Sequence, residues 1–422
     1  MKSKWFITLI LALTTIHCSN NELLKPAANL VNFAHLEHLT QTIHLNGQPC
    51  DIIHIYSEYP DYQWVDADEE GIACVDDVAR AAVVYLRYFE LTGIDSVLPK
   101  AQRLLNFVLH LQAGDGEFYN FIDSTLQINK TYRTSEKSFN FWAARGYWAL
   151  GLGYRIFKNK DEAYAAQLKQ AFLKCTMPIQ NCLKFYHQYE VINGRKYPLW
   201  LVNQYGSDAT AELLLGIDEF LKAEANNLLK GSIPSEKAVL AEYAKQLAEG
   251  IIAMQLEDGN FYPGAFLSWP NIWHAWGNAQ TQALAALGKT LNDHQLIQAA
   301  KREADLYFAR LLKDGWLQEW QLGQEAQARR FPQIAYGVRC LALGLLRLYE
   351  ATGDTNCARQ AVQAASWLWG NNAAKTPMYD PQTGRCFDGI VDSTKVNLNS
   401  GAESTIEGLY TMIEIAKVSF FK

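Results

Sequence analysis

Carboxylates that could perform acid–base chemistry stand at three places in the sequence, each at or just before an apolar stretch. Asp76 and Asp77 are consecutive, Glu136 lies in a polar and aromatic segment, and Glu403 stands one helical turn before Glu407. Glycosidic bonds are hydrolysed by such pairs, one carboxyl group protonating the leaving oxygen while the other acts on water or on the sugar. We expect Asp76 or Asp77 to be the base, since a helix N-terminus keeps a carboxylate charged. We expect Glu136 or Glu403 to be the acid, its pKa raised by burial.

Other polar and aromatic residues near the same stretches suit sugar binding, because aromatic faces stack on sugar rings while amides and charged groups bind hydroxyls. These substrate-binding candidates are Arg80, Trp142, Asp208, Trp273, His274, Asn278, Tyr336 and Arg339. His274 could instead be the base of an epimerase or lyase, and Tyr336 and Arg339, three residues apart, could bind an acidic sugar.

Each of these residues also has a purely structural interpretation. Asp, Ser and Asn are ordinary helix N-caps, tryptophans fill cores, and Arg339 could form a structural ion pair. Capping, however, needs only one of Asp76 and Asp77. Glu403 and Glu407 lie in an apolar helix where no solvated face is expected.

The residues between the candidates repeat a helical pattern. Stretches rich in Ala, Gly and Leu begin about 60–70 residues apart, at 77–93, 145–158, 208–221, 277–290, 334–353 and 402–418. Between them lie amphipathic stretches at 98–112, 162–175, 237–255, 294–312 and 357–369. Helices that are apolar all round are buried, and amphipathic helices cover them.

This alternation predicts an all-α fold, an (α/α)6 toroid of six helical hairpins formed by one domain over residues 23–422. Residues 23–60 would supply the first outer helix. Because the inner helices would run parallel, their N-termini and the candidates there would share one mouth. The alternative is an open helical-repeat superhelix.

The N-terminus has the pattern of an export signal. Lys2 and Lys4 precede an apolar run at 5–13 that is too short to span a bilayer, and Cys18 stands where a bacterial lipoprotein signal has its lipidated cysteine. His17 replaces the small residue usual before that cysteine. We expect residues 1–18 to be a signal peptide and the protein to be a bacterial outer-membrane lipoprotein, or otherwise periplasmic or secreted.

Charge and motif content exclude several classes of partner. The net charge is −6, without a basic stripe, so we expect no nucleic acid and no membrane contact beyond the anchor at Cys18. No spacing typical of a metal site or of a phosphate-binding loop occurs, so we expect no metal and no cofactor. Cys175 and Cys182 could pair across a short loop; alternatively they are free thiols.

Three motifs resemble a known family. They are Gly-Ile-Ala-Cys-Val-Asp-Asp-Val-Ala-Arg-Ala at 71–81, Gly-Glu-Phe-Tyr-Asn-Phe at 116–121, and Ser135-Glu136 followed by Ala-Arg-Gly-Tyr-Trp-Ala-Leu-Gly at 144–151. This region resembles the six-hairpin glycosidase superfamily, and especially bacterial helical-toroid domains associated with mannan-processing enzymes and glycosyltransferases.

The resemblance extends over about residues 70–155 and implies roles for Asp76, Asp77, Arg80, Glu136 and Arg145. The sequence departs from the family pattern with Val78 for Asn, Tyr119 for His and Lys137 for Asp. The last change removes a carboxylate next to Glu136.

The leading hypothesis is therefore a glycoside hydrolase that acts on an oligosaccharide or polysaccharide. An inverting mechanism would place its two carboxyl groups roughly 6.5–9.5 Å apart. The alternatives are a polysaccharide lyase or sugar epimerase on the same ring, and a non-catalytic glycan-binding surface lipoprotein.

Overall fold

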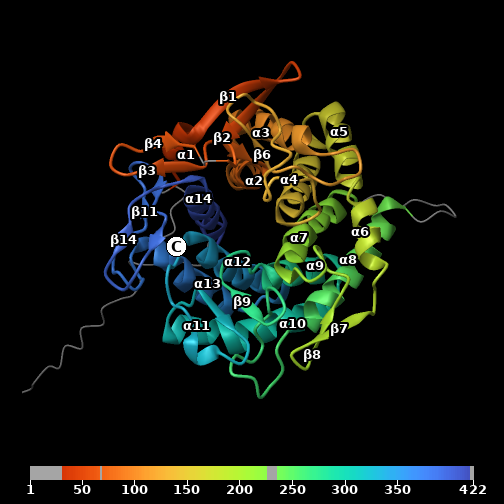
Figure 1. The fold of residues 1–422 in the computed structure, drawn as a ribbon, viewed down its shortest axis with the longest axis vertical. Helices are drawn as coiled ribbons and strands as arrows, with labels where there is room; N and C mark the ends of the chain where they lie inside the picture. Colours follow the sequence, from red (N-terminus) through yellow and green to blue (C-terminus); the bar gives the residue numbers. More distant parts are fainter. Residues whose placement is uncertain (1–30, 67–68, 226–234, 419–422) are drawn as a thin grey trace, which may run out of the picture.

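Six parallel inner helices form a closed ring in the computed structural model, which describes residues 31–66, 69–225 and 235–418 (Figure 1). Each inner helix packs against the next, and the last packs against the first. They are α2 (Val75–Thr92), α4 (Phe141–Phe157), α7 (Ser207–Ala223), α9 (Gln280–Leu291), α12 (Ala335–Thr352) and α14 (Ala402–Ala416). The predicted (α/α)6 toroid is confirmed.

An outer layer of helices covers this ring. Five outer helices each pack on the inner helix that precedes them, namely α3 (Leu98–Leu111), α5 (Glu162–Leu173), α8 (Glu236–Ala253), α10 (His294–Glu303) and α13 (Thr355–Ala365). The π-helical turn Ala304–Phe308 and α11 (Ala309–Asp314) extend α10, the short helix α6 (Thr176–Leu183) follows α5, and the 3-10 turn η6 (Ser366–Trp369) follows α13.

The sixth outer position differs from the expectation for residues 23–60. Among the described residues of that segment, only α1 (Ala34–Leu39) is helical, and it packs on α14. The chain then turns into two antiparallel hairpins, β1 (Thr40–Leu45) with β2 (Gln48–Ile53) and β3 (Tyr56–Glu58) with β4 (Gln63–Val65). The N-terminal part of the chain therefore closes the ring against the C-terminal helix.

Glycines allow the inner helices to approach closely. A Cβ atom on Gly151 of α4 would lie 2.4 Å from the main-chain oxygen of Gly216 on α7, and one on Gly216 would lie 2.8 Å from Cα of Trp148. No side chain fits between these backbones. The small residues that mark the inner helices in the sequence thus bring adjacent helices, and the polar groups at their ends, close together.

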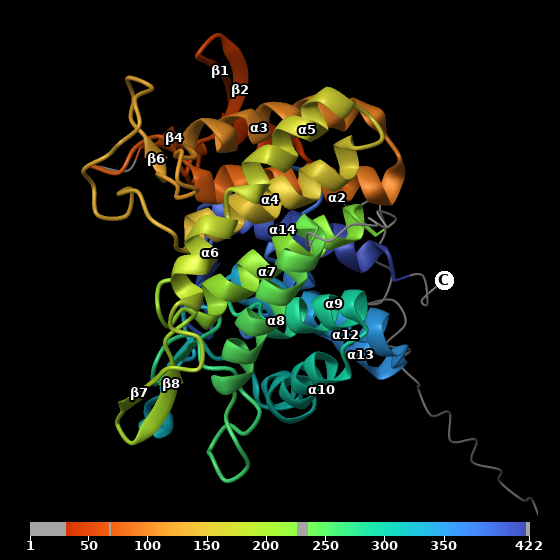
Figure 2. The same ribbon diagram turned by 90° about the vertical axis from the view of Figure 1, so that its right-hand side faces the viewer.

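Long loops and short hairpins gather on one side of the ring, whereas the last residues of α14 lie on the other (Figure 2). The further antiparallel pairs are β5 (Ala73–Cys74) with β6 (Phe121–Ile122), β7 (Tyr189–Ile192) with β8 (Arg195–Pro198), β9 (Ile272–His274) with β10 (Glu319–Gln321), β11 (Tyr379–Asp380) with β12 (Arg385–Cys386), and β13 (Gly389–Ile390) with β14 (Val396–Asn397). The loop-rich side is where the inner helices begin, and we call it the mouth. The expected signal peptide and Cys18 lie outside the described residues.

Candidate active site

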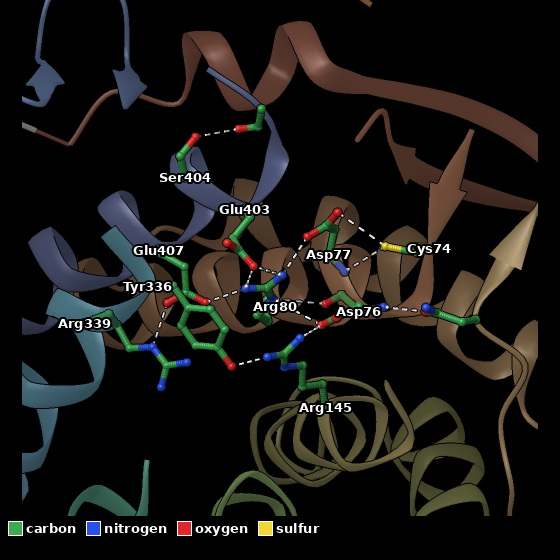
Figure 3. Close-up of polar contacts among 12 residues, drawn as sticks. Cys74, Asp76, Asp77, Arg80, Arg145, Tyr336, Arg339, Glu403, Ser404 and Glu407 are labelled. Carbon is green, nitrogen blue, oxygen red and sulfur yellow. Dashed lines mark hydrogen bonds and ion pairs between the residues drawn. The ribbon is translucent and has the colours of Figure 1, made fainter. Parts of the chain in front are cut away.

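Arg80, in the first turns of α2, is the centre of an ionic cluster at the mouth (Figure 3). Its Nη2 donates to Asp77 Oδ1 at 2.7 Å and its Nη1 to Glu407 Oε1 at 2.7 Å. Glu403 Oε2 lies 3.4 Å from Nη1, and Asp76 Oδ1 lies 3.4 Å from Nε. One guanidinium group from α2 thus holds two carboxylates of its own helix and two from α14.

Two more arginines extend this cluster across the ring. Arg145 of α4 donates to Asp76 and to the Tyr336 hydroxyl. Arg339 of α12 donates to Glu407 Oε2 at 2.6 Å and to Glu212 Oε1 of α7 at 3.0 Å. We call the eight charged residues the mouth cluster: Asp76, Asp77, Arg80, Arg145, Glu212, Arg339, Glu403 and Glu407.

The mouth cluster holds five carboxylates and three guanidinium groups. Burial penalises every carboxylate charge, and three cations cannot compensate five anions. For Asp76 and Glu407 the arginines prevail over burial and hold the pKa below its usual range. For Asp77, burial and the charge of Asp76 outweigh Arg80 and raise the pKa. For Glu403, burial raises the pKa to about 7 against the opposing effect of Arg80.

These carboxylates also differ in side-chain exposure and in hydrogen-bond partners. The side chains of Glu403 and Asp76 are 45% and 24% exposed, whereas those of Asp77 and Glu407 are almost fully buried. In the part of the chain that the structure describes, Glu403 Oε1 and Asp76 Oδ2 have no hydrogen-bond partner, while both oxygens of Asp77 and of Glu407 are engaged. Glu403 and Asp76 therefore each present one free oxygen at the mouth, whereas the unpartnered Oε2 of Glu212 is fully buried.

Cys74 explains the position of Asp77. It is the N-cap residue of α2, where its Sγ accepts from the Asp77 main-chain nitrogen and donates to Asp77 Oδ2 at 3.3 Å. Asp77 is thus not itself the cap, and the consecutive aspartates point to different partners. Asp76 contacts Arg145, and Asp77 contacts Arg80 and the thiol.

His274 and Asp208 form a second polar group at the starts of the third and fourth inner helices. His274 Nε2 lies 3.2 Å from Asp208 Oδ2, and its Nδ1 lies 2.6 Å from the Trp276 carbonyl oxygen. The imidazole also stacks on the Trp276 ring at 4.1 Å. Because both nitrogens face acceptors, the ring makes both contacts as a donor only when both carry a proton.

Among the described residues, the remaining sequence candidates form no hydrogen bond or ion pair with the free oxygens of Glu403 and Asp76. Glu136 is exposed in the loop before α4, and no hydrogen bond or ion pair of its side chain occurs among the described residues. Trp273 is buried and stacks on Trp320, and Asn278 is buried against the Phe266 carbonyl group. The half-buried Trp142 donates to the Phe118 carbonyl oxygen. Tyr336 and Arg339 are fully buried within the cluster, as in the structural interpretation of that pair.

Sequence reasoning did not single out Glu212, which is fully buried opposite Arg339, or Tyr56. Tyr56 lies on β3, where the Ile55 and Ser57 carbonyl oxygens accept from Ala402 and Ser400 at 2.9 and 3.1 Å. These bonds fix an exposed phenol beside the start of the helix that carries Glu403. Burial, together with Glu70 and Asp77, raises the pKa of Tyr56. No local pattern marks Tyr56, because its place beside Glu403 depends on hydrogen bonds with Ser400 and Ala402 at the other end of the chain.

The structure also bears on metals, thiols and membranes. Among the described residues, no group of three or more His, Cys, Asp or Glu side chains is arranged to hold a metal ion. Cys175 and Cys182 are free thiols rather than a disulfide. Within the same residues, no helix has both the length and the apolar character needed to cross a bilayer.

We compared the chain with known proteins by sequence and by structure. No family model matches the sequence, and no curated protein matches it. Solved structures do match. A sugar epimerase from a ruminal bacterium is 15% identical with a TM-score of 0.56, and a cellobiose 2-epimerase from Bacillus thermoamylovorans is 12% identical with a TM-score of 0.58. In both cases 87% of this chain and 92% of the other are covered.

A third match is an inactive variant of an α-1,6-mannanase from Salegentibacter sp., with two consecutive aspartates replaced by alanine, in complex with α-1,6-mannotetrose. It is 11% identical with a TM-score of 0.55, over 94% of this chain and 98% of that one. At these identities the likeness is one of fold. The chain has the toroid fold of the six-hairpin glycosidase superfamily.

Proposed function

We propose that the protein is a glycoside hydrolase that cleaves an oligosaccharide or polysaccharide at the mouth of the ring. The observation that carries this proposal is the unequal charge of the mouth cluster, five carboxylates against three guanidinium groups, with free oxygens on Glu403 and Asp76. A purely structural ion-pair network has no reason to leave acidic groups uncompensated, whereas acid–base catalysis needs them.

Glu403 is the general acid of this proposal. A pKa of about 7 keeps much of the carboxyl group protonated near neutral pH, and its exposure gives the proton a path to a leaving-group oxygen. Arg80 holds Oε2 and leaves Oε1 free for the substrate.

Asp76 is the general base. Arg145 and Arg80 both contact its Oδ1 and keep it charged, so Oδ2 is available to take a proton from water. Asp76 and Glu403 contact different nitrogens of one guanidinium group, an arrangement compatible with the separation of roughly 6.5–9.5 Å in inverting enzymes. Asp77, with both oxygens engaged, positions Arg80.

The mannanase neighbour supports the assignment, because its inactive variant has alanine in place of two consecutive aspartates. This chain has its own consecutive pair, Asp76 and Asp77, at the start of α2. A mannan fragment is therefore the first substrate to test.

The test is hydrolysis of a glycan panel that includes α-1,6-mannan, with reducing ends and product anomers measured by NMR. We expect the initial products of the wild type to have inverted configuration. Glu403→Gln and Asp76→Asn should each lose activity by about 10²–10⁴-fold. Glu136→Gln decides whether the exposed loop carboxylate takes part. Asp61→Asn, at an exposed position between β3 and β4, is the matched control. Full activity of Glu403→Gln would refute the assignment.

An epimerase is the second candidate, and the pairing of His274 with Asp208 is the observation that favours it, together with the epimerases among the structural neighbours. If the ring catalysed epimerisation, sugars incubated in deuterium oxide would incorporate deuterium at carbon, and His274→Ala would abolish that incorporation. Hydrolysis without such exchange excludes this candidate.

We also propose export and attachment to the outer membrane through Cys18, on the strength of the signal-like residues 1–18. Metabolic labelling with a radioactive fatty acid should label the wild type and not Cys18→Ser. Labelling of neither, with soluble protein in the periplasm or medium, would instead indicate simple secretion.

A further inference from the structure

A pocket of about 470 Å³ lies where the end of α11, the start of α12 and the end of α13 meet. Its walls are the last turn of α11 with the two residues that follow it, at 311–316, the segment at 330–333 before α12 and the loop at 371–375 after η6. Because outer helices end and inner helices begin on the mouth side, this pocket opens on the same side of the ring as the mouth cluster.

The pocket is rich in uncompensated positive charge. Lys313, Arg330 and Lys375 line it, and none of the three forms an ion pair in the described part of the chain. The one carboxylate in the lining, Asp314, faces Arg310 at 3.6 Å. Arg330 Nη1 donates to the Asp314 main-chain oxygen at 3.1 Å, which fixes the guanidinium group without neutralising it. In a protein of net charge −6, this local excess of cations indicates an anionic ligand.

The other lining groups suit a sugar ring rather than a bare anion. Trp316 and Phe331 are half-buried aromatic side chains, and Gln363 and Asn371 add exposed amides. Aromatic faces and amides together bind the faces and hydroxyls of sugars, and the volume lies within the range of small-molecule sites. A site for free phosphate or sulfate needs no aromatic wall.

The pocket wall is joined to the mouth by main-chain hydrogen bonds. Gln333 pairs with Ile390 in both directions, at 3.0 and 2.9 Å. Two residues before Ile390, Asp388 accepts from the Gly401 nitrogen and from the Ser404 hydroxyl group, on either side of Glu403. These hydrogen bonds connect the pocket wall to the segment that carries Glu403.

We propose that this pocket is a binding subsite for an acidic sugar residue, whose carboxylate lies among Lys313, Arg330 and Lys375 while its ring contacts Trp316. The two sites differ in charge, so they take different residues of one chain. The mouth cluster, with excess carboxylate, disfavours an acidic residue, whereas the pocket selects one. The subsite goes beyond the proposed hydrolysis and does not depend on it, because binding needs no turnover.

The test is calorimetric titration of the full chain with trigalacturonate, a neutral mannotriose and inorganic sulfate. We expect trigalacturonate to bind most tightly, with an affinity that falls as salt is added. Arg330→Ala should weaken it at least tenfold, and Lys375→Ala less. Arg329→Ala is the matched control, since Arg329 is adjacent but pairs with Glu319 at 2.9 Å, and it should change the affinity less than twofold.

Equal affinity of wild type and Arg330→Ala for trigalacturonate would overturn the proposal. So would sulfate binding as tightly as trigalacturonate, which would indicate an anion site without sugar recognition, or mannotriose binding equally well. Retained trigalacturonate binding by Glu403→Gln would support a subsite separate from the mouth. That result would stand even if no glycan is hydrolysed.

Discussion

The same inner helices carry two ionic networks, one at each end of the ring, and the two differ in balance. The mouth cluster has five carboxylates and three guanidinium groups. The far-end network has five cations and five carboxylates among the described residues, namely Arg87, Glu90, Arg155, Asp218, Glu219, Lys222, Arg347, Glu350, Glu414 and Lys417.

The pKa values follow this difference. At the far end, burial opposes ionisation of Glu90, Glu219 and Glu414, but the cations around them prevail and lower the pKa of all three. At the mouth, the pKa of Asp77 and Glu403 is raised instead. The positive ends of the inner helices help the mouth to tolerate its excess of acid. We therefore expect the balanced far-end network to stabilise the ring and the unbalanced mouth cluster to take part in catalysis.

The largest expected effect is at the mouth cluster, where a substitution should abolish activity without lowering stability. Glu403→Gln should reduce kcat by about 10³-fold, because the amide cannot donate the acid's proton. Its Tm should equal or exceed that of the wild type, since an uncompensated carboxylate is removed. Calorimetry beside initial rates on the cleaved glycan measures both, and a Tm lowered by many degrees would mean that Glu403 is structural.

A substitution in the far-end network should instead lower stability and leave activity unchanged. Arg87→Ala leaves the buried Glu219 with one contact fewer, and we expect about 3–5 kcal/mol of lost stability in urea unfolding. For the folded protein, kcat/KM should stay within twofold of the wild type. The double variant Arg87→Ala/Glu219→Gln should recover part of the stability. If Arg87→Ala is as stable as the wild type, the far-end network is not a structural clamp.

The pH dependence of the two ends should also differ. The Glu403 carboxyl group keeps its proton in the folded state up to about pH 7, whereas the unfolded state releases it near the ordinary pKa of 4.5. Wild-type stability therefore declines through this range as pH rises, relative to Glu403→Gln, by about 1–2 kcal/mol after allowance for solvent screening.

The pKa values of Glu90, Glu219 and Glu414 are depressed, so the contribution of these three carboxylates is complete above the ordinary pKa and is lost only in acid. Urea unfolding of both proteins at pH 5 and pH 8 measures the difference, and a difference that does not change with pH would contradict the raised pKa. Over the same range, kcat/KM of the wild type should fall as pH rises through about 7.

The smallest effect concerns Tyr56, an exposed tyrosine at the mouth. Tyr56→Ala should lower kcat/KM about tenfold, because an exposed ring beside Glu403 would no longer contact the sugar. Tyr56→Phe should keep most activity if the ring face matters, and should lose as much as Tyr56→Ala if the hydroxyl group does. Unchanged kcat/KM in both variants would show that Tyr56 does not contact the substrate.

The ring itself was predictable because burial on several sides is a local property of each helix. Stretches rich in Ala, Gly and Leu must pack on neighbours wherever they lie, and Gly151 and Gly216 show that their small residues serve this packing. The sixth outer position was not predictable, because the segment after α1 forms one hairpin that packs on α2 and α3 and a second that bonds to the segment before α14.

The candidate site was predictable in part for the same reason. The sequence alone determined that acidic groups stand at the starts of several apolar helices, and Asp76, Asp77 and Glu403 could be named from that position. Tertiary structure decided which of them has a free oxygen, that Glu136 is exposed, and that Tyr56 and Glu212 belong to the neighbourhood. The physical reason is ring closure. Arg80 and Glu407 lie 327 positions apart in sequence and 2.7 Å apart in space, and no local spacing encodes the balance of charge that such contacts create.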